Sequence, residues 1–436
     1  MKKNGFIMST YVYILLVFFL LLLGTMLVVL NNTRLLANKI KENTDGNIDF
    51  NLVLKGDKEI FIVKDSEYIE PGCIATTFDG EKLEVRVMGE VNAKKSGEYD
   101  IEYSAEYKGV EKKVKRKVIV GENLVTYITN LYEDSITRAS NNLKKDNTED
   151  KNIRYYGANP NNYVRFNNEL WRIIGIFGNN VKLIRNDRLG WLSWDTSEST
   201  VNNGYGINQW GESKDTSGNI YEGADLQVYL NKMYYDGIEV TCYNDLNNTK
   251  TTCPKDSNGN FLELDDVAKN LIDNHTWNIG AMRYISRTNT LTFYQAERGS
   301  VHGKSSCSSG NQCNDTIIRT TEWTGYVGLP YVTDWAYASS ESVCETNMAT
   351  QDSSNNYICK NNNWMQKSIL AWYLLPVTTS SGACYAWYVN KTGDPAGNYT
   401  YGLGGVIPAV YLKSDVFVTG GLGTSDNPYK LWLSEN

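Results

Sequence analysis

The spacing of hydrophobic and polar positions changes along the chain, and each change marks a different predicted element. Tyr11–Leu30 is a run of twenty uncharged, mostly apolar residues. As a helix it spans about 30 Å, enough to cross a bilayer. A cleaved secretory signal has a shorter apolar region followed by a small-residue cleavage pattern, and "NNTRLLANK" lacks that pattern. The run therefore predicts a membrane anchor. Charges flank it on both sides, so charge alone does not decide its orientation.

Residues 52–120 alternate between apolar and polar side chains. "EIFIV", "YDIEYSAEY" and "KKVKRKVIV" have the period of two that is typical of half-buried strands, and turns such as "FDGE" separate them. Short strands at this spacing predict an antiparallel sandwich.

Residues 122–155 then combine a helical apolar spacing, in "NLVTYITNLYEDSITRASNNL", with the charged run "KKDNTEDKN". This segment predicts a connecting helix and a solvated linker.

From residue 156 onward the pattern indicates many short strands joined by Gly, Asn and Ser loops. In "YVRFNNELWRIIGIFGNNVKLIRN", apolar stretches flank two turn sequences and predict a three-stranded meander. In "ADLQVYLNKMYYDGI" the apolar spacing predicts an amphipathic helix. The side chains expected on its buried face are Leu226, Tyr229, Leu230 and Met233.

Composition narrows the classes of function. The chain has 436 residues and a net charge of −7 with no basic cluster, so a nucleic-acid partner is not expected. Only two histidines are present, which argues against histidine-based zinc sites and histidine-dependent triads. The 30 tyrosines and 11 tryptophans in a polar chain favour an extracellular, β-rich protein with aromatic surfaces.

Six of the eight cysteines form three pairs that are close in sequence: Cys242/Cys253, Cys307/Cys313 and Cys344/Cys359. Each pair spans a polar loop, and no C-x-x-C is present, so local disulfides fit better than zinc. Each closure stabilises the fold by about 2–3 kcal/mol and indicates an oxidising compartment. Cys73 and Cys384 are left over, and Cys73 is expected to be a buried free thiol.

The tryptophans divide into two groups. Trp171 and Trp372 lie within apolar strands and are expected in the core. Five others lie near Gly-, Asn- and Ser-rich loops, where core packing and ligand stacking both stay open. These candidate ligand-binding residues are Trp191, Trp194, Trp210, Trp335 and Trp387.

No catalytic or metal motif appears. "DSNGNFLELDD" (residues 256–266) offers oxygen ligands but lacks the EF-hand spacing, so a plain polar loop is expected and calcium is the alternative. Nucleophile-elbow, P-loop and dinucleotide-binding fingerprints are missing from the sequence. We therefore predict no catalytic residue, no metal ligand and no cofactor.

The N-terminus resembles the leader of type IV prepilins and pseudopilins. In "KKNGFIMST" a short basic leader ends in Gly before Phe, and the apolar run follows. The resemblance implies cleavage between Gly5 and Phe6. Those families usually carry Glu four residues after the Phe, where this chain has Thr10. A plain signal anchor and a pilin-like subunit both stay open.

Residues 52–120 resemble a bacterial Ig-like surface module. The family pattern appears here as Tyr68, Glu70, Pro71, Gly72, Ala75, Asp79, Gly80, Gly97, Tyr99, Ile101, Tyr103 and Ala105. The resemblance implies a spacer or adhesion domain with no chemistry of its own.

The C-terminal region resembles extracellular domains of gut bacteria whose architecture is similar to the C-type-lectin-like and formylglycine-generating-enzyme-like fold. The matching segments are Trp171–Ile174, Leu226–Asn231, Leu329–Ala338, Trp372–Pro376 and Gly405–Leu412. Leu374, Leu375 and Ile407 depart from the family pattern, in which Arg stands at two of these positions.

Together these features predict four segments: a transmembrane and stalk helix (1–45), an all-β Ig-like sandwich (46–121), a helical and charged linker (122–155) and an α+β lectin-like head with many short antiparallel strands (156–436). The expected protein is anchored in the cell membrane by a single pass, with its C-terminal domains extracellular. Its expected role is binding or adhesion to a glycan or protein ligand. Assembly with pilin-like subunits, a surface hydrolase or modifying enzyme, and a structural envelope or secretion-system component are the alternatives.

Overall fold

The computed structural model describes most of the chain beyond residue 48. The described ranges are 49–196, 207–244, 250–283, 289–299, 317–318, 320–354, 356–378 and 384–433, with five isolated positions before them. Gly5, Phe6 and most of Tyr11–Leu30 lie outside these ranges, as do the predicted leader cleavage and stalk. Within the described part of the chain, no helix is both long enough and apolar enough to span a bilayer. The chain divides into two compact units, Met1–Ile119 and Val120–Asn436.

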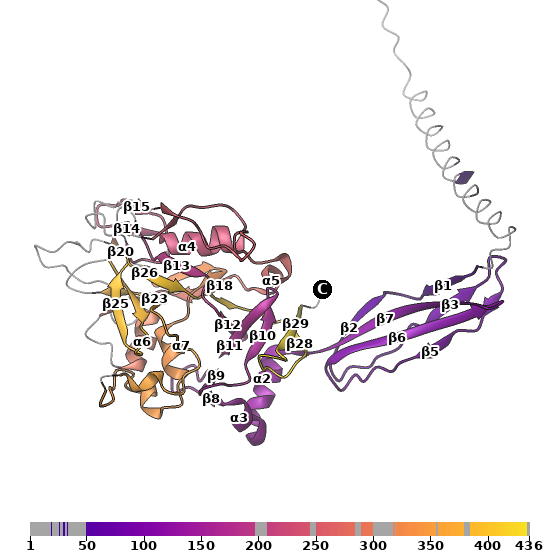
Figure 1. The fold of residues 1–436 in the computed structure, drawn as a ribbon, viewed down its shortest axis with the longest axis horizontal. Coiled ribbons are helices and arrows are strands. Elements are labelled where there is room, and N and C mark those ends of the chain that lie inside the picture. Colours follow the sequence, from indigo (N-terminus) through magenta and orange to yellow (C-terminus); the bar gives the residue numbers. More distant parts are fainter. Residues whose placement is uncertain are drawn as a thin grey trace, which may run out of the picture. The chain divides into compact units, whose positions relative to one another are not determined.

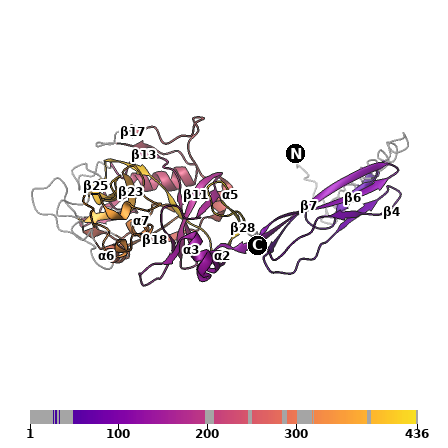
Figure 2. The same ribbon diagram turned by 60° about the horizontal axis from the view of Figure 1, so that its bottom comes forward.

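The first unit is built from two antiparallel sheets, as the alternating pattern predicts. In Figures 1 and 2 its strands run lengthwise beside one another. One sheet has the order β1-β3-β4, and the other has the order β2-β7-β6-β5. The strands are β1 (Asn51–Leu54), β2 (Glu59–Val63), β3 (Cys73–Thr76), β4 (Lys82–Leu83), β5 (Arg86–Met88), β6 (Gly97–Tyr107) and β7 (Val110–Asn123).

The core of this unit is small and contains one buried cation. Phe50, Ala75 and Ala105 pack at its centre. Arg116 has no exposed surface; it pairs with the Glu70 carboxylate, and its Nε donates to the Asp57 carbonyl at 3.0 Å. A buried guanidinium is tolerated only when it is paired and hydrogen-bonded, and these contacts supply both.

In the second unit, the head, the predicted meander is confirmed. Strands β10 (Tyr163–Phe166), β11 (Glu169–Phe177) and β12 (Asn180–Arg185) pair in antiparallel order. Asn167 and Asn168 form the first turn with φ angles of 53° and 56°. Asn tolerates this left-handed region better than other side chains, which explains why the hairpin turns there.

The meander lies inside a larger sheet with the order β22-β27-β12-β11-β10-β29-β28, and a second sheet has the order β13-β26-β23-β24-β25. The remaining strands of the head are β8 (Leu143–Lys145), β9 (Ile153–Tyr155), β13 (Gly190–Ser193), β14 (Ser213–Asp215), β15 (Ile220–Tyr221), β16 (Cys242–Tyr243), β17 (Lys250–Thr251), β18 (His275–Asn278), β19 (Met282–Arg283), β20 (Ile317–Ile318), β21 (Glu322–Gly325), β22 (Val327–Gly328), β23 (Ala371–Thr378), β24 (Tyr385–Val389), β25 (Pro395–Tyr399), β26 (Leu403–Val406), β27 (Ala409–Tyr411), β28 (Val416–Gly420) and β29 (Tyr429–Leu433).

Helices cover the strands of the head (Figures 1 and 2). They are α2 (Leu124–Glu133), α3 (Ser135–Asn141), α4 (Asp225–Val228), the π-helix η2 (Tyr229–Tyr235), α5 (Asp266–Leu271), α6 (Thr290–Glu297) and α7 (Val332–Tyr337), with the 3-10 turns η4 (Ser342–Glu345) and η5 (Ile358–Lys360). The helix predicted from "ADLQVYLNKMYYDGI" is present as α4 and η2, and its predicted apolar face is buried. The described structure is mostly β. The one connecting helix that was expected in 122–155 is present as two helices, α2 and α3.

The charged run after α3 belongs to a hairpin of the head and does not form a separate linker. Strands β8 and β9 pair as a hairpin within the head. Asp146 is only 2% exposed and accepts hydrogen bonds from Arg154 Nε at 2.7 Å and from the backbone N–H of Asn152 at 3.2 Å. The other charged side chains of the run are mostly exposed, as predicted: Lys145, Glu149, Asp150 and Lys151. The burial of Asp146 depends on the distant fold and cannot be detected from a local count of charges.

Candidate functional site

The five candidate tryptophans separate by burial. Trp194, Trp210, Trp335 and Trp387 have no exposed surface, whereas Trp191 is 41% exposed. A fully buried ring cannot stack on a ligand, so the structure favours the packing alternative for those four. Trp191 stays accessible, with the Arg188 guanidinium 5.3 Å from its ring centre. The predicted core residues Trp171 and Trp372 are fully buried, as expected.

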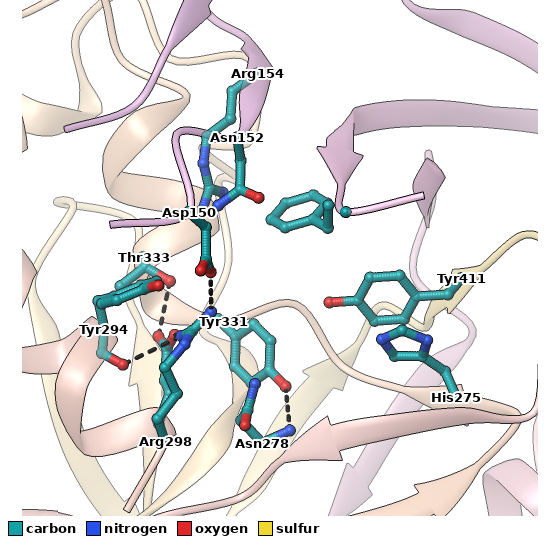
Figure 3. Close-up of a pocket in the computed structure, with 13 residues that line it drawn as sticks. Asp150, Asn152, Arg154, His275, Asn278, Tyr294, Arg298, Tyr331, Thr333 and Tyr411 are labelled. Atoms are coloured by element: carbon teal, nitrogen blue, oxygen red, sulfur yellow. Dashed lines mark hydrogen bonds and ion pairs between the residues drawn. The ribbon is translucent and has the colours of Figure 1, made fainter. Parts of the chain in front are cut away.

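The head contains a pocket of about 340 Å³, within the range of about 300–1,000 Å³ that is usual for small-molecule sites. Segments far apart in sequence form it: the β8–β9 hairpin, the end of β11, β18, α6, the start of α7, and β27 (Figure 3). The lining residues are Asp150, Asn152, Arg154, Phe177, Gly178, His275, Asn278, Tyr294, Glu297, Arg298, Tyr331, Thr333 and Tyr411.

Aromatic rings form much of the pocket wall. The His275 ring stacks on the Tyr411 ring, with 3.7 Å between centroids and 23° between planes. Tyr294, Tyr331 and Tyr411 are each 6% exposed or less. Burial lowers the pKa of His275, and the Asp273 carboxylate, 3.0 Å from Nδ1, offsets this only in part. The imidazole is therefore neutral at pH 7 and presents an aromatic face.

A buried ion network lies under the pocket. Asp334 Oδ2 is 2.7 Å from Lys182 Nζ, and Asp334 Oδ1 is 2.7 Å from Arg154 Nη1. Arg154 also pairs with Asp146 through Nε at 2.7 Å. Burial alone raises the pKa of Asp334, but the charges of Lys182 and Arg154 overcome it, so the pKa lies below its usual value. Each charge in this network has a partner.

Glu297 is a buried carboxyl group of the pocket lining, and its Oε2 lies 3.6 Å from Arg298 Nη1. It is 2% exposed, and its Oε1 accepts a hydrogen bond from Thr333 Oγ1 at 2.7 Å. Burial raises the pKa of Glu297 to about 7, and the Arg298 charge and the Thr333 hydrogen bond offset only part of that rise. Near neutral pH this carboxyl group can therefore either donate or accept a hydrogen bond.

Arg298 and Asp150 form the outer charge pair of the pocket. Arg298 Nη2 lies 2.7 Å from Asp150 Oδ2, and its guanidinium carbon lies 3.5 Å from the centre of the Tyr294 ring. Arg298 follows the last residue of α6, where a cation is favoured by the helix dipole. The stacking and the helix end hold the guanidinium in one orientation. The Asp150 carboxylate is bound to it there (Figure 3).

A second pocket, of about 290 Å³, contains the carboxylates of Asp195 and Asp225. Both already act in local structure. Asp225 Oδ2 accepts hydrogen bonds from the backbone N–H and the hydroxyl of Thr196, at 2.8 and 3.0 Å, and Asp195 accepts one from the backbone N–H of Ile207. Both carboxylates of this pocket therefore hold its own loops in place.

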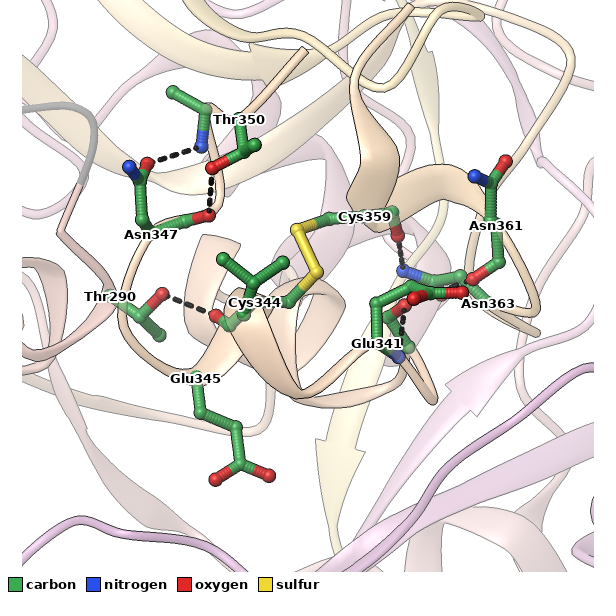
Figure 4. Close-up of a disulfide and its surroundings, with 12 residues drawn as sticks. Thr290, Glu341, Cys344, Glu345, Asn347, Thr350, Cys359, Asn361 and Asn363 are labelled. Carbon is green, nitrogen blue, oxygen red and sulfur yellow. Dashed lines mark hydrogen bonds between the residues drawn. A yellow bond between two sulfur atoms is a disulfide. The ribbon is translucent and has the colours of Figure 1, made fainter. Parts of the chain in front are cut away.

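Two of the predicted disulfides are confirmed, Cys242–Cys253 and Cys344–Cys359. Both cysteines of the second pair are fully buried, and Asn363 Nδ2 donates to the Cys359 carbonyl at 2.7 Å (Figure 4).

The third predicted disulfide, between Cys307 and Cys313, lies outside the described residues. Cys384 is disulfide-bonded. Cys73 is a free thiol, as expected, but it is partly exposed and not buried.

In the loop considered for calcium (residues 256–266), the first carboxylate stabilises the loop itself. Asp256 Oδ1 accepts the backbone N–H groups of Asn258 and Asn260, at 2.8 and 2.9 Å. Across the described ranges, no three His, Cys, Asp or Glu side chains are grouped to hold a metal ion.

None of the pocket residues was singled out from the sequence as a site residue. Tyr331 and Thr333 fall within one segment that carries the lectin-like resemblance, and Tyr411 falls within another. The only other signal was the rarity of histidine, since His275 is one of two in the chain.

Comparison with known proteins identifies the first unit. Residues 52–120 match the family model described as "Bacterial surface protein, Ig-like domain". This confirms the predicted Ig-like module, and the chain is a surface-associated protein. No curated protein matches the chain.

Two solved structures show partial likeness. The lipoprotein BT2262 from Bacteroides thetaiotaomicron is 31% identical over 17% of this chain and 39% of its own, with a TM-score of 0.16. The CBM51-2 and INT domains of ZmpB from Clostridium perfringens are 12% identical over 39% of this chain and 38% of their own, with a TM-score of 0.14. This chain thus spans well under half the length of either, and neither TM-score carries a structural argument.

Proposed function

We propose that this protein binds a small carbohydrate at the cell surface, through the pocket of about 340 Å³ in its head. The observation that carries the proposal is the combination of aromatic faces with polar groups in one pocket. The His275 ring, whose side chain is 24% exposed, offers an aromatic surface, and the partly exposed side chains of Asn278 and Asp150 offer hydrogen-bonding atoms. Sugar rings present the matching chemistry, with C–H faces and hydroxyl edges.

The Ig-like module supports the surface location of this activity. The resemblance to bacterial Ig-like surface modules implies a spacer or adhesion domain, so the proposed role of residues 52–120 is to carry a binding head. The lectin-like architecture of the head belongs to the same proposal. Binding of a protein ligand is the alternative occupant of this head.

Membrane attachment and processing also belong to the proposal. Tyr11–Leu30 is uncharged and long enough to cross a bilayer, and the leader resembles that of pilin-like subunits. N-terminal sequencing of the mature protein tests this, because a chain beginning at Phe6 supports the pilin-like start. A chain that keeps Met1 or Lys2 supports a plain anchor.

The binding proposal is tested with the full-length chain, purified in a detergent that has no sugar headgroup. We expect neutral glycans on an array to bind, and His275→Ala to weaken the best of them about tenfold, or about 1.4 kcal/mol. Thr276→Ala is the matched control, because Thr276 is exposed on the same strand and does not line the pocket. Absence of binding to any glycan, or equal effects of both variants, would contradict the proposal.

A hydrolase is the second candidate, and one specific observation favours it. Glu297 and Asp150 are two carboxyl groups of different exposure on one pocket, and paired carboxyl groups are the machinery of glycoside hydrolysis. In that case the bound glycan is cleaved by the wild-type chain and not by Glu297→Gln. Binding without cleavage supports the primary proposal.

A further inference from the structure

The charges around the pocket cancel one another. Arg298 is paired with Asp150 at 2.7 Å and with the buried Glu297 at 3.6 Å. Arg154 is paired with Asp146 and Asp334, and Lys182 with Asp334. No cation of the described pocket lining is left to balance an anionic ligand. Bringing a carboxylate from water into such a site is unfavourable unless a partner is available there.

Arg298 is the cation closest to being such a partner. Its side chain is 32% exposed, its guanidinium lies over the Tyr294 ring at 3.5 Å, and it ends α6. A fixed guanidinium of this kind is well suited to bind a carboxylate, because its N–H groups match two oxygen atoms.

The Asp150 carboxylate already lies where a ligand carboxylate would bind Arg298. Its carboxylate lies 2.7 Å from Arg298 Nη2 and is itself 46% exposed, in the turn of the β8–β9 hairpin (Figure 3). An acidic ligand must displace Asp150 or lie beside it, and both arrangements are unfavourable. An uncharged ligand meets neither difficulty and can use the pocket with Asp150 in place.

We infer that the pocket selects uncharged sugars, and that Asp150 determines this specificity by occupying Arg298 in place of a ligand carboxylate. This inference rests on the proposed function and adds the ligand class to it. Asp150 is a specificity residue here, since it acts through Arg298 and through its own charge.

Matched pairs of monosaccharides test the inference. Glucose is compared with glucuronate, and galactose with galacturonate, on the full-length chain in the same detergent. Dissociation constants are measured by calorimetry or by saturation-transfer NMR. We expect the wild type to bind at least one hexose and to bind its uronate at least about tenfold more weakly.

Asp150→Asn is expected to shift the uronate-to-hexose affinity ratio at least about tenfold toward the uronate. The shift should shrink in high salt, because the exposed charge pair is screened. Asp150→Asn with Arg298→Gln should lose the shift. The control is Asp266→Asn, which makes the same charge change on α5 at a side chain 98% exposed, and it should leave the ratio unchanged. A thermal melt of each variant shows that it is folded.

Two results overturn the inference alone: a wild-type chain that binds a uronate as tightly as its hexose, and an Asp150→Asn variant whose ratio does not change. If no monosaccharide binds the wild type and the array is also blank, the proposed function fails at this pocket and the inference fails with it.

Discussion

Asp334 Oδ2 lies 2.7 Å from Lys182 Nζ, and neither side chain exposes any surface to solvent. Asp334 also accepts from Arg154 Nη1 at 2.7 Å and from the backbone N–H of Tyr331 at 2.9 Å. One carboxylate therefore connects β9, β12 and the start of α7. Tyr331, whose backbone N–H binds this carboxylate, also lines the pocket.

We predict that Asp334→Ala destabilises the protein by about 3–5 kcal/mol, because it leaves Lys182 and Arg154 buried beside an unfilled position. Urea unfolding followed by tryptophan fluorescence measures the change. Asp150→Ala is the control for a charge pair near the surface, and we expect it to change the free energy of unfolding by less than about 1 kcal/mol. Similar losses in the two variants would contradict the network as described.

The pKa of Glu297, raised to about 7 by burial, predicts a pH-dependent stability. Between the ordinary carboxyl pKa near 4.5 and the folded value, the folded state binds more protons than the unfolded state. The free energy of unfolding therefore falls as pH rises through this window, and Glu297 lowers it by about 3 kcal/mol above pH 7.

Glu297→Gln replaces the titratable carboxyl group with an amide and keeps an oxygen that accepts from the Thr333 hydroxyl. We expect the variant to gain stability over the wild type between pH 5 and pH 8, by about 3 kcal/mol across that interval. Urea unfolding at the two pH values measures it. The other titrating groups are shared by both chains, so their contributions cancel in the difference. A constant difference would mean that Glu297 is ionised at both pH values.

Local patterns were sufficient to predict the elements that are local in the structure. The meander of β10, β11 and β12 depends on alternation and on the turn at Asn167 and Asn168, which are neighbours in sequence. The α4–η2 helix depends on the spacing of Leu226, Tyr229, Leu230 and Met233. Both predictions are confirmed because the residues that decide them lie within a few turns of one another.

The pocket could not be predicted in this way. Arg154 and its partner Asp334 are 180 residues apart, so no local pattern reveals that Arg154 and Asp146 are buried in one ion network. Glu297, Asp150 and Tyr411 belong to an α-helix, a hairpin turn and a strand, with no fixed spacing between them. Tryptophans near polar loops were candidate ligand contacts, but four of the five pack into the hydrophobic core of the head.

Trp194 and Trp191 form a pair three residues apart with opposite exposure, 0% and 41%. Trp194 packs against Trp210 with 5.0 Å between ring centroids. We predict that Trp194→Ala destabilises the protein by about 3–5 kcal/mol through the cavity that it leaves. Trp191→Ala should lower the free energy of unfolding by less than about 1 kcal/mol, since Trp191 is exposed and leaves no enclosed cavity. Thermal unfolding checks both, and an equal loss would contradict the burial of Trp194.

The Cys344–Cys359 disulfide closes a loop with a sequence separation of 15 residues, and both cysteines are fully buried. A cross-link of this length stabilises a fold by about 3 kcal/mol, chiefly by restricting the unfolded chain. We therefore expect the double variant Cys344→Ala, Cys359→Ala to lose at least that much under non-reducing conditions. Cys73→Ser is the matched control: its free thiol donates to the Val53 carbonyl at 3.1 Å, and a serine hydroxyl can keep that bond. Equal stability of the double variant and the wild type, or a peptide map that joins either cysteine elsewhere, would show that this loop is closed differently.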